Sequence, residues 1–178
     1  MLALRAGDES AFDALFRRWS GPLLRYLERM LRDAASAEEL VQEAFLRLYR
    51  ARERYEPEAR FSTWLFTIAN RLALNELRRP HRRSPHESSD DDAAGAPLAL
   101  AAEQAGVDEV VHARRLGDAV ERALAALPER QRAALWLTAV EGLSYAEVAA
   151  SLETTEKSVK ALVHRARSAL AETIDTEV

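Results

Sequence analysis

The sequence contains no cysteine among its 178 residues, which excludes disulfide bonds and metal sites built from thiolates. Glycine and proline are scarce, with six of each, while 48% of the residues are hydrophobic and 30% are charged. This composition indicates a soluble and mostly helical chain. No apolar run is long enough to span a bilayer, and residues 1–10 lack the apolar stretch of a signal peptide. We therefore expect a cytoplasmic protein without membrane insertion.

Signatures of catalysis are also missing. The sequence has no glycine-rich phosphate loop, no nucleophile elbow and no cluster of carboxylates that would indicate a catalytic cleft. The histidines His81, His86 and His112 lack the regular spacing and the neighbouring carboxylates of a metal site. We therefore expect neither an enzyme nor a protein that holds a metal or cofactor.

The distribution of charge is more informative than its sum. The net charge is −4, but lysines and arginines cluster at residues 71–83 and 157–167, and Glu87 and Asp90 to Asp92 form an acidic run. A nucleic-acid partner would therefore be bound by local basic patches and not by the overall field.

The clearest motif is GLSYAEVAASLETTEKSVKALVHRARSAL, residues 142–170. Ser144 and Glu147 have the spacing of a capping box, which predicts a helix that begins at Tyr145. Thr155 is placed to cap a second helix. Two short helices around a tight turn are typical of a helix-turn-helix, whose second helix enters the DNA major groove.

The second helix of this motif has two distinct faces at about 100° per residue. The apolar face consists of Val159, Val163, Ala166 and Leu170. The opposite face consists of Lys157, Lys160, Ala161, His164 and Ser168, with Arg165 and Arg167 at its margins. An ordinary helical hairpin with a solvated basic face would show the same spacing, so the pattern alone leaves both interpretations open.

The N-terminal part predicts further amphipathic helices. Residues 8–31 form one or two helices, with a break or kink at Gly21-Pro22 and an aromatic core stripe of Phe12, Leu15, Phe16 and Trp19. Ser36 and Glu39 form a second capping box, which predicts a helix through about Arg52. Its inward face is Val41, Ala44, Phe45 and Leu48, and its outer face includes Leu46. A single exposed leucine is common, but this polar grouping would also suit a protein contact.

The rest of the chain completes a two-domain organisation. Residues 62–79 form a helix with a core stripe of Phe61, Trp64, Leu65, Ile68 and Leu72 and an arginine-rich end, and Pro80 terminates it. Residues 80–115 have the composition of a flexible linker, with a weak helix possible between 98 and 112. A second domain begins near Leu116, where Val120, Leu124 and Leu127 form one helix and Leu135, Leu137 and Val140 mark another after Pro128. The sequence therefore predicts an all-α protein with two small helical domains, 1–79 and 116–178.

Two groups of segments together resemble a known family. They are AEELVQEAFLRLYR followed by FSTWLFTIANRLALNELRR, and LPERQRAALWLTAVEGLSYAEVAASL followed by VKALVHRAR. They are similar to the extracytoplasmic-function (ECF) sigma factors of bacterial RNA polymerase, a group of the sigma-70 family. The resemblance covers nearly the whole chain outside the linker. It implies that residues 1–79 are region 2 and residues 116–178 region 4 of a factor that directs promoter recognition and transcription initiation.

The resemblance also implies roles for particular residues. The clamp of core RNA polymerase would contact the outer face of the 37–50 helix: Glu39, Gln42, Glu43 and Leu46. The −10 promoter element would be captured and melted by Phe61, Trp64, Asn70, Arg71, Arg78 and Arg79. The −35 element would be read by Arg130, Lys157, Ser158, Lys160, Ala161, His164 and Arg165. Arg130 and Arg132 would reach backbone phosphate or the polymerase flap, and an anti-sigma factor is a further implied partner.

Some positions depart from the family pattern. Glu153 stands where many relatives have glycine in the turn, which would cost about 1 kcal/mol if that residue is left-handed. Leu162 stands where arginine is common, and it is either a core residue or a DNA contact that has been given up. A stand-alone helix-turn-helix regulator and a helical adaptor that binds only protein remain as alternatives. The outer face of the 37–50 helix argues against the regulator, which needs no polymerase-binding surface.

Overall fold

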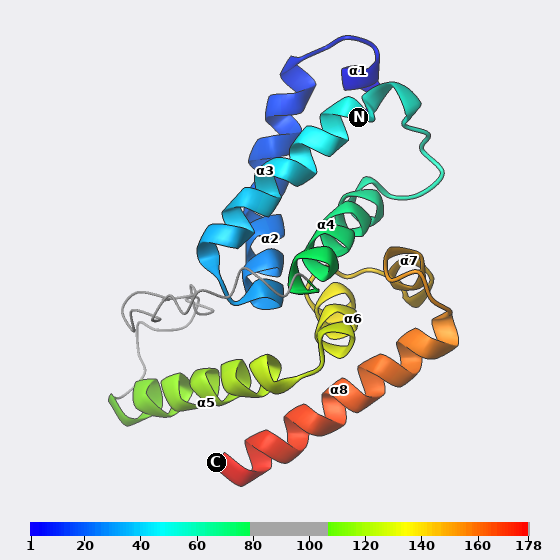
Figure 1. Ribbon diagram of the computed structural model, residues 1–178. Helices are drawn as coiled ribbons and strands as arrows, with labels where there is room; N and C mark the ends of the chain where they lie inside the picture. The colour runs from blue at the N-terminus through cyan, green and yellow to red at the C-terminus, as the bar shows by residue number, and fades with distance from the viewer. Residues whose placement is uncertain (79–106, 178) are drawn as a thin grey trace.

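The structure, a computed structural model, describes residues 1–78 and 107–177, with side chains described over 1–78 and 117–173. Within these ranges every regular element is helical (Figure 1), which confirms the all-α prediction. None of the described helices is long and apolar enough to cross a membrane. The elements are α1 (Leu2–Arg5), α2 (Ser10–Leu31), α3 (Ala34–Arg50), the 3-10 helix η1 (Arg52–Arg54), α4 (Phe61–Leu77), α5 (Val107–Ala126), α6 (Glu129–Ala139), α7 (Tyr145–Ser151) and α8 (Glu156–Glu177).

α2 is one helix, so of the two alternatives stated for Gly21-Pro22, a break or a kink, the break does not occur. Pro22 lies inside α2, where it removes one backbone hydrogen bond. The turns after it bury Leu23, Tyr26 and Leu27 completely, and this burial offsets the loss of the hydrogen bond. The aromatic stripe at the start of α2 is less buried than predicted, because Phe16 is 40% exposed.

α3 begins earlier than the sequence indicated. The predicted capping box of Ser36 and Glu39 is wrong, since Asp33 is the N-cap and its side chain accepts a hydrogen bond from the backbone N–H of Ala35. The Ser36 hydroxyl donates to the second carboxylate oxygen of Asp33 at 2.6 Å and so supports that cap. The predicted inward face is confirmed: Val41, Ala44, Phe45 and Leu48 are all buried.

α4 packs across α2 and α3 and is buried over a broad face. Leu65 and Leu72 of the predicted stripe are buried, while Phe61, Trp64 and Ile68 are partly buried against the same core. The buried face also includes Phe66, Ala69, Asn70 and Ala73. A helix that contacts neighbours on more than one side has no single apolar stripe, which explains why the sequence underestimated this burial.

The helix expected near Leu116 begins earlier in the chain. α5 starts at Val107, inside the segment expected to be a linker, and residues 80–106 of that expected linker lie outside the described residues. The helix-turn-helix matches its prediction, because Ser144 and Glu147 form a capping box at the start of α7. Thr155 accepts a hydrogen bond from the backbone N–H of Ser158 at the start of α8. Val140 is not a core residue, being 56% exposed at the end of α6.

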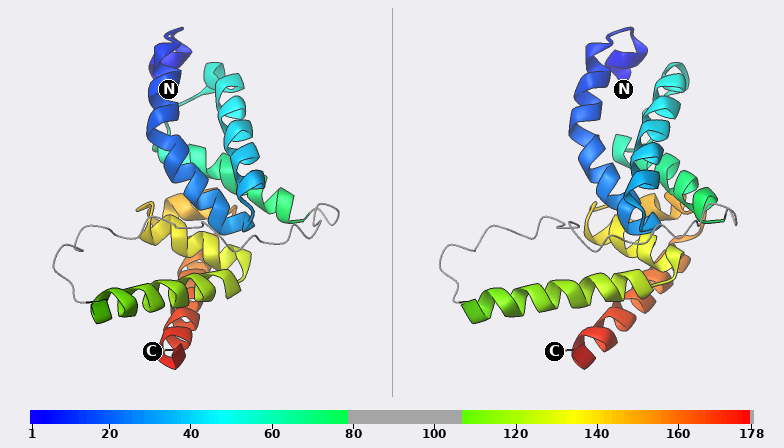
Figure 2. Two further views of the ribbon diagram at one scale, coloured as in Figure 1. Left: turned by 90° about the vertical axis from the view of Figure 1, so that its left-hand side faces the viewer. Right: turned by 60° about the vertical axis from the view of Figure 1, so that its left-hand side comes forward.

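The two helical domains are packed against each other. α4 contacts α7, and α2 contacts α6, so the helix-turn-helix sits directly beneath the first domain (Figure 1). The views in Figure 2 show α5 and α8 on the side of α6 away from α2 and α3. The core residues of both domains accordingly form one continuous buried cluster.

Candidate nucleic-acid and polymerase interface

The outer face of α3 is exposed as predicted. Leu46 is 42% exposed, and Glu39 and Gln42 lie exposed on the same side of the helix. Glu43 is half-buried and accepts a hydrogen bond from Arg47 at 2.6 Å. This α3 face (Glu39, Gln42, Glu43 and Leu46) therefore presents an apolar side chain surrounded by polar groups, an arrangement suited to a protein contact.

The residues of α4 expected to touch DNA do not form one open surface. Asn70 is only 1% exposed: its carbonyl oxygen accepts from the Tyr26 hydroxyl at 3.0 Å and its amide nitrogen donates to the Ser151 carbonyl at 3.1 Å. Arg71 is exposed but paired with Glu153 at 2.7 Å. The Asn70 side chain is therefore inaccessible to a ligand in this arrangement, in contrast to its predicted role.

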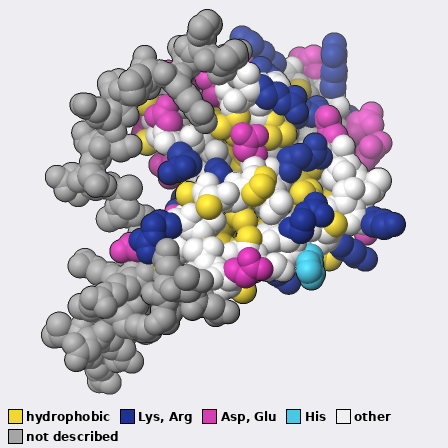
Figure 3. All heavy atoms as spheres, turned by 60° about the horizontal axis from the view of Figure 1, so that its bottom comes forward, with side chains coloured by type: hydrophobic (Ala, Val, Ile, Leu, Met, Phe, Trp, Pro, Cys, Tyr) yellow, Lys and Arg dark blue, Asp and Glu magenta, His cyan; other side chains and the backbone are white. Residues whose placement is uncertain are grey.

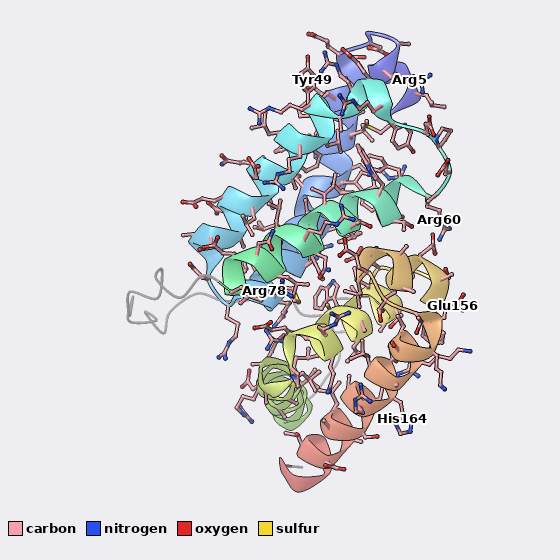
Figure 4. All side chains as sticks on the ribbon, turned by 45° about the vertical axis from the view of Figure 1, so that its right-hand side comes forward. Arg5, Tyr49, Arg60, Arg78, Glu156 and His164 are labelled. Atoms are coloured by element: carbon pink, nitrogen blue, oxygen red, sulfur yellow. The ribbon has the colours of Figure 1, made fainter. Side chains whose placement is uncertain are left out.

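The last described arginine of α4 is open to solvent. Arg78 is exposed at the C-cap of α4, at the opposite end of the helix from Arg60 (Figure 4). Arg79 lies outside the described residues. Arg78 is therefore the predicted DNA contact at this end of α4 whose exposure the structure describes.

A cleft lies beside the start of α4, where Phe61 forms part of its lining. Phe61 packs edge-on against Trp19 with ring centroids 5.7 Å apart, and Trp64 packs against Tyr55 at 5.1 Å. The cleft has a volume of about 720 Å³, and its lining residues include Trp19, Tyr55, Phe61, Arg18 and Arg60. Aromatic faces beside guanidinium groups are suited to stack unpaired bases and hold phosphates.

The second helix of the helix-turn-helix presents its basic face outward. Val159, Val163 and Ala166 are buried, and α8 contacts α5, α6 and α7. The opposite face carries exposed Lys157, Lys160, His164 and Arg165, with Ser158 and Ala161 half-buried beside them. Figure 4 shows His164 pointing away from the other helices, and Figure 3 shows lysine and arginine side chains spread over the lower surface of the molecule.

Leu162 lies between these two faces. It is half-buried and packs against the hydrophobic core. This packing favours the core interpretation over a DNA contact that has been given up.

The two arginines after Pro128 differ in environment. Arg130 is exposed, but it donates to the Leu152 carbonyl at 3.0 Å, so it supports the turn in addition to any contact outside the chain. Arg132 is only 7% exposed, and the suggestion that it reaches phosphate or the flap is wrong. Both arginines were predicted to be surface cations. The sequence does not indicate that the fold brings the Leu152 carbonyl to Arg130 and the Arg29 and Met30 carbonyls to Arg132.

Arg132 uses all five of its N–H groups within the chain. They donate to the carbonyls of Leu124, Ala125 and Leu127 near the end of α5 at 2.8–3.0 Å, and to those of Arg29 and Met30 near the end of α2 at 3.0 and 3.2 Å. Terminal carbonyls of a helix lack partners and carry partial negative charge. Burial and the positive charge of Arg32 lower the pKa of Arg132, and the negative charge of Glu129 partly opposes this shift. Arg132 of the second domain therefore stabilises the contact with the first domain through its hydrogen bonds to the carbonyls of Arg29 and Met30.

Comparison with known families agrees with this organisation. A family model described as "Sigma-70 region 2" matches residues 15–83, and one described as "Sigma-70, region 4" matches residues 117–170. The two matches fall on the first and second helical domains in the order predicted from the sequence.

Curated relatives of the chain are sigma factors. It is 32% identical to the ECF RNA polymerase sigma-E factor of Escherichia coli, covering 94% of this chain and 88% of that one. It is 33% identical to the RNA polymerase sigma-H factor of Pseudomonas aeruginosa, with the same shares covered. It is 34% identical to the ECF sigma factor SigE of Mycolicibacterium smegmatis, covering 92% of this chain and 63% of that relative.

Solved structures share the fold. CnrH in complex with the cytosolic domain of CnrY is similar at a TM-score of 0.68 and 22% identity, covering 98% of this chain and 94% of that one. The sigma factor RpoE in complex with the anti-sigma factor NepR from Bartonella quintana is similar at a TM-score of 0.68 and 21% identity, covering 94% and 99%. From the two family matches and these relatives, the chain belongs to the sigma-70 family of RNA polymerase sigma factors, in its ECF group, and is a non-enzymatic transcription initiation factor.

Proposed function

We propose that this sigma factor binds core RNA polymerase through the α3 face and recognises a promoter at two elements, the −10 element with α4 and the −35 element with α8. The observation that carries the proposal is the outward basic face of α8 in a helix-turn-helix whose other face is buried. In this motif the second helix enters the major groove.

The α3 face supports the polymerase contact. Leu46 remains exposed although the adjacent Phe45 is buried and contacts Phe16 and Phe12. An exposed leucine near the paired charges of Glu43 and Arg47 forms a small apolar centre with a polar rim, the composition of many protein interfaces. We infer that the clamp of the polymerase covers this surface.

The cleft beside α4 supports recognition of melted DNA. Trp19, Tyr55 and Phe61 supply ring faces, and Arg18 and Arg60 supply positive charge at the same cleft. A base flipped from the −10 element would gain roughly 1–3 kcal/mol from stacking. Phe61 then acts as part of the wall of this cleft, Trp64 supports the wall by packing against Tyr55 and Phe61, and Arg78 holds the backbone further along α4.

The α8 face supports recognition of duplex DNA. Lys157, Lys160 and Arg165 would contact phosphates or guanine edges, whereas Ala161 and His164 lie toward the centre of the face. We also infer that the factor acts in the cytoplasm and is controlled by an anti-sigma factor. Similar folds occur in CnrH bound to the cytosolic domain of CnrY and in RpoE bound to the anti-sigma factor NepR.

Run-off transcription tests the proposal. Purified core polymerase, with and without this chain, is given a library of fragments from the source genome, and the transcripts are sequenced. Transcripts that start at defined positions only when the chain is present, downstream of a shared pair of elements, would support the function. Binding of the chain to DNA without any polymerase-dependent transcript would favour a stand-alone regulator instead.

A further inference from the structure

The short helix α1 turns back against α2 and the 3-10 helix η1 (Figure 1). Gly7 allows this reversal, because it has a φ of 96°, a conformation that glycine adopts far more readily than other residues. Asp8 supports the start of α2, since its carboxylate accepts hydrogen bonds from the backbone N–H and the hydroxyl of Ser10 at 3.0 and 2.6 Å. A helix as short as α1 is not stable alone, so its position depends on contacts with the rest of the domain.

Two side chains of α1 keep it in this position. Leu4 is 2% exposed and belongs to the hydrophobic core. The Arg5 guanidinium donates a hydrogen bond from Nη1 to the Tyr55 carbonyl at 2.7 Å, across 50 residues of sequence. Figure 4 shows Arg5 at the end of the first domain that lies away from His164. α1 therefore contacts both the core and the segment that precedes α4.

This segment, residues 55–60, connects η1 to α4 and forms one side of the cleft. Tyr55, Pro57 and Arg60 are among the residues that line the cleft. Tyr55 is buried, whereas residues 56–60 are exposed. Among the described residues none forms a hydrogen bond with the backbone of 56–59. The hydrogen bond from Arg5 to the Tyr55 carbonyl is thus the contact that fixes the backbone where this exposed segment begins.

α1 also lines the cleft directly. Leu2 is part of the lining together with the rings of Trp19 and Phe61 and the guanidinium of Arg18. It is 56% exposed, so an apolar side chain faces water at this site. A base bound in the cleft would cover part of Leu2 and remove that apolar surface from water, which favours binding.

We propose that α1 is a wall of the base-binding cleft, in which Leu2 contacts the flipped base of the −10 element and Arg5 is a positioning residue that acts through Tyr55. The inference rests on the proposed function, because it takes the cleft to be the site of that base. It extends the −10 contact to residues 2–5, which lie outside the two matched family segments, 15–83 and 117–170.

The wall determines the selectivity of the cleft more than its affinity. Stacking on aromatic rings tolerates any base, because every base has a π face. The choice among bases therefore depends on how closely the cleft fits the base that enters it. Without the Arg5 hydrogen bond, segment 55–60 is free to shift, and the cleft then accepts more than one base.

The variant Arg5→Ala tests the positioning role. Arg5 is exposed, so its replacement removes little packing and the chain should fold. Holoenzyme made from core polymerase and each variant is titrated with labelled single strands of a −10 element selected by the wild-type chain, with each of the bases in turn at every position. We expect the affinity ratio between the preferred base and the others to fall by about threefold or more at one position, and to stay unchanged at the other positions.

Two further variants separate the hydrogen bond from the charge. Arg5→Lys should restore most of the selectivity, because a lysine ammonium can donate to the same Tyr55 carbonyl. Arg54→Ala removes the same charge from an exposed position in η1 and is the matched control, which should select bases as the wild-type chain does. Loss of selectivity in Arg54→Ala equal to that in Arg5→Ala would overturn the positioning role.

The variant Leu2→Ala tests the direct contact. Affinity for the strand with the preferred base should fall by roughly threefold, whereas affinity for a strand that is abasic at the same position should not change, because Leu2 then has no base to contact. Val140→Ala is the matched control, since Val140 is also 56% exposed but lies at the end of α6. Equal losses on the intact and abasic strands would show that Leu2 has a structural role only and would overturn the contact.

An independent variant decides the question if Arg5→Ala does not fold. A Cβ added at Gly7 meets no atom within 4 Å, so Gly7→Ala acts through backbone strain at a positive φ and displaces α1. It should reduce selectivity at the same −10 position. Unchanged selectivity in Gly7→Ala and Leu2→Ala, beside a wild-type chain that does select a base, would overturn the proposal. A wild-type holoenzyme that selects no base at any position would instead overturn the proposed function.

Discussion

The Asn70 amide nitrogen donates to the Ser151 carbonyl oxygen at 3.1 Å, across 81 residues of sequence. The Tyr26 hydroxyl completes the arrangement by donating to the Asn70 carbonyl oxygen. Three helices of two domains, α2, α4 and α7, therefore share one buried polar contact. An asparagine expected to read DNA instead fixes the relative position of the domains.

The first prediction concerns the polymerase contact. Leu46→Glu should weaken capture of core polymerase at least tenfold while the circular dichroism spectrum and melting temperature remain unchanged, because Leu46 is exposed. Leu48→Glu on the same helix is the contrasting variant, since Leu48 is fully buried and its replacement by a charge should unfold the first domain. Unchanged capture by a folded Leu46→Glu chain would show that the polymerase binds elsewhere.

Features determined by local sequence could be predicted. The capping box of Ser144 and Glu147 and the cap at Thr155 occur as expected, because each depends on atoms within one helical turn. The N-cap of α3 is equally local, yet Ser36 was predicted in place of Asp33, which accepts a hydrogen bond from the backbone N–H of Ala35. Both residues have side chains suited to an N-cap, and Ser36 instead donates its hydroxyl to Asp33.

Features determined by contacts between domains could not be predicted. Arg132 and Arg130 look alike in the sequence, yet Arg132 is buried by carbonyls of α2 more than 100 residues away. Burial of Asn70 depends in the same way on α7. Neither the periodicity of a helix nor its charge indicates which of its exposed-looking residues another domain will cover.

The second prediction tests the role of Arg132. Arg132→Lys should lower the free energy of unfolding by about 1–3 kcal/mol, because a lysine ammonium cannot reproduce five hydrogen bonds from a planar guanidinium and leaves buried carbonyls unpaired. Arg130→Lys is the matched control, since Arg130 is exposed and donates a hydrogen bond to the Leu152 carbonyl. Urea unfolding of both variants measures the difference. Equal stability would mean that the carbonyls of α2 and α5 are satisfied by water instead.

The third prediction uses the position of Leu162. Leu162→Arg should lower the melting temperature, because the half-buried leucine packs against the core and the arginine would lose that packing. If the variant instead melts at the wild-type temperature and binds promoter DNA more tightly, with a steeper salt dependence, the position is a DNA contact. Thermal melting and a salt titration on the same preparation separate the two outcomes.

The fourth prediction concerns pH. Burial raises the pKa of Glu141 above its usual 4.5, although the Trp136 hydrogen bond and the charge of Arg25 oppose this. The folded chain therefore binds this proton more readily than the unfolded chain, and the resulting stability is present below about pH 4.5 and is lost as pH rises through the folded pKa. Glu141→Gln mimics the protonated form and can still accept from Trp136. It should melt higher than wild type at pH 7 and equal to it near pH 4; a variant less stable at pH 7 would show that the pairing with Arg25 outweighs burial.

The last prediction distinguishes two roles for Arg165 on the exposed face of α8. If its guanidinium reads a base edge of the −35 element, Arg165→Ala should cost about 1–3 kcal/mol on the cognate sequence and relax the preference at one position. If it holds phosphate, binding should weaken equally on all sequences and the salt slope should fall by about one. Arg167→Ala, at the other margin of the face and also exposed on α8, is the comparison. Titration of labelled duplexes with single-position changes at two salt concentrations measures both effects. An Arg165→Ala chain with unchanged affinity and slope would remove this residue from the DNA interface and shift the predicted contact toward Lys160 and His164.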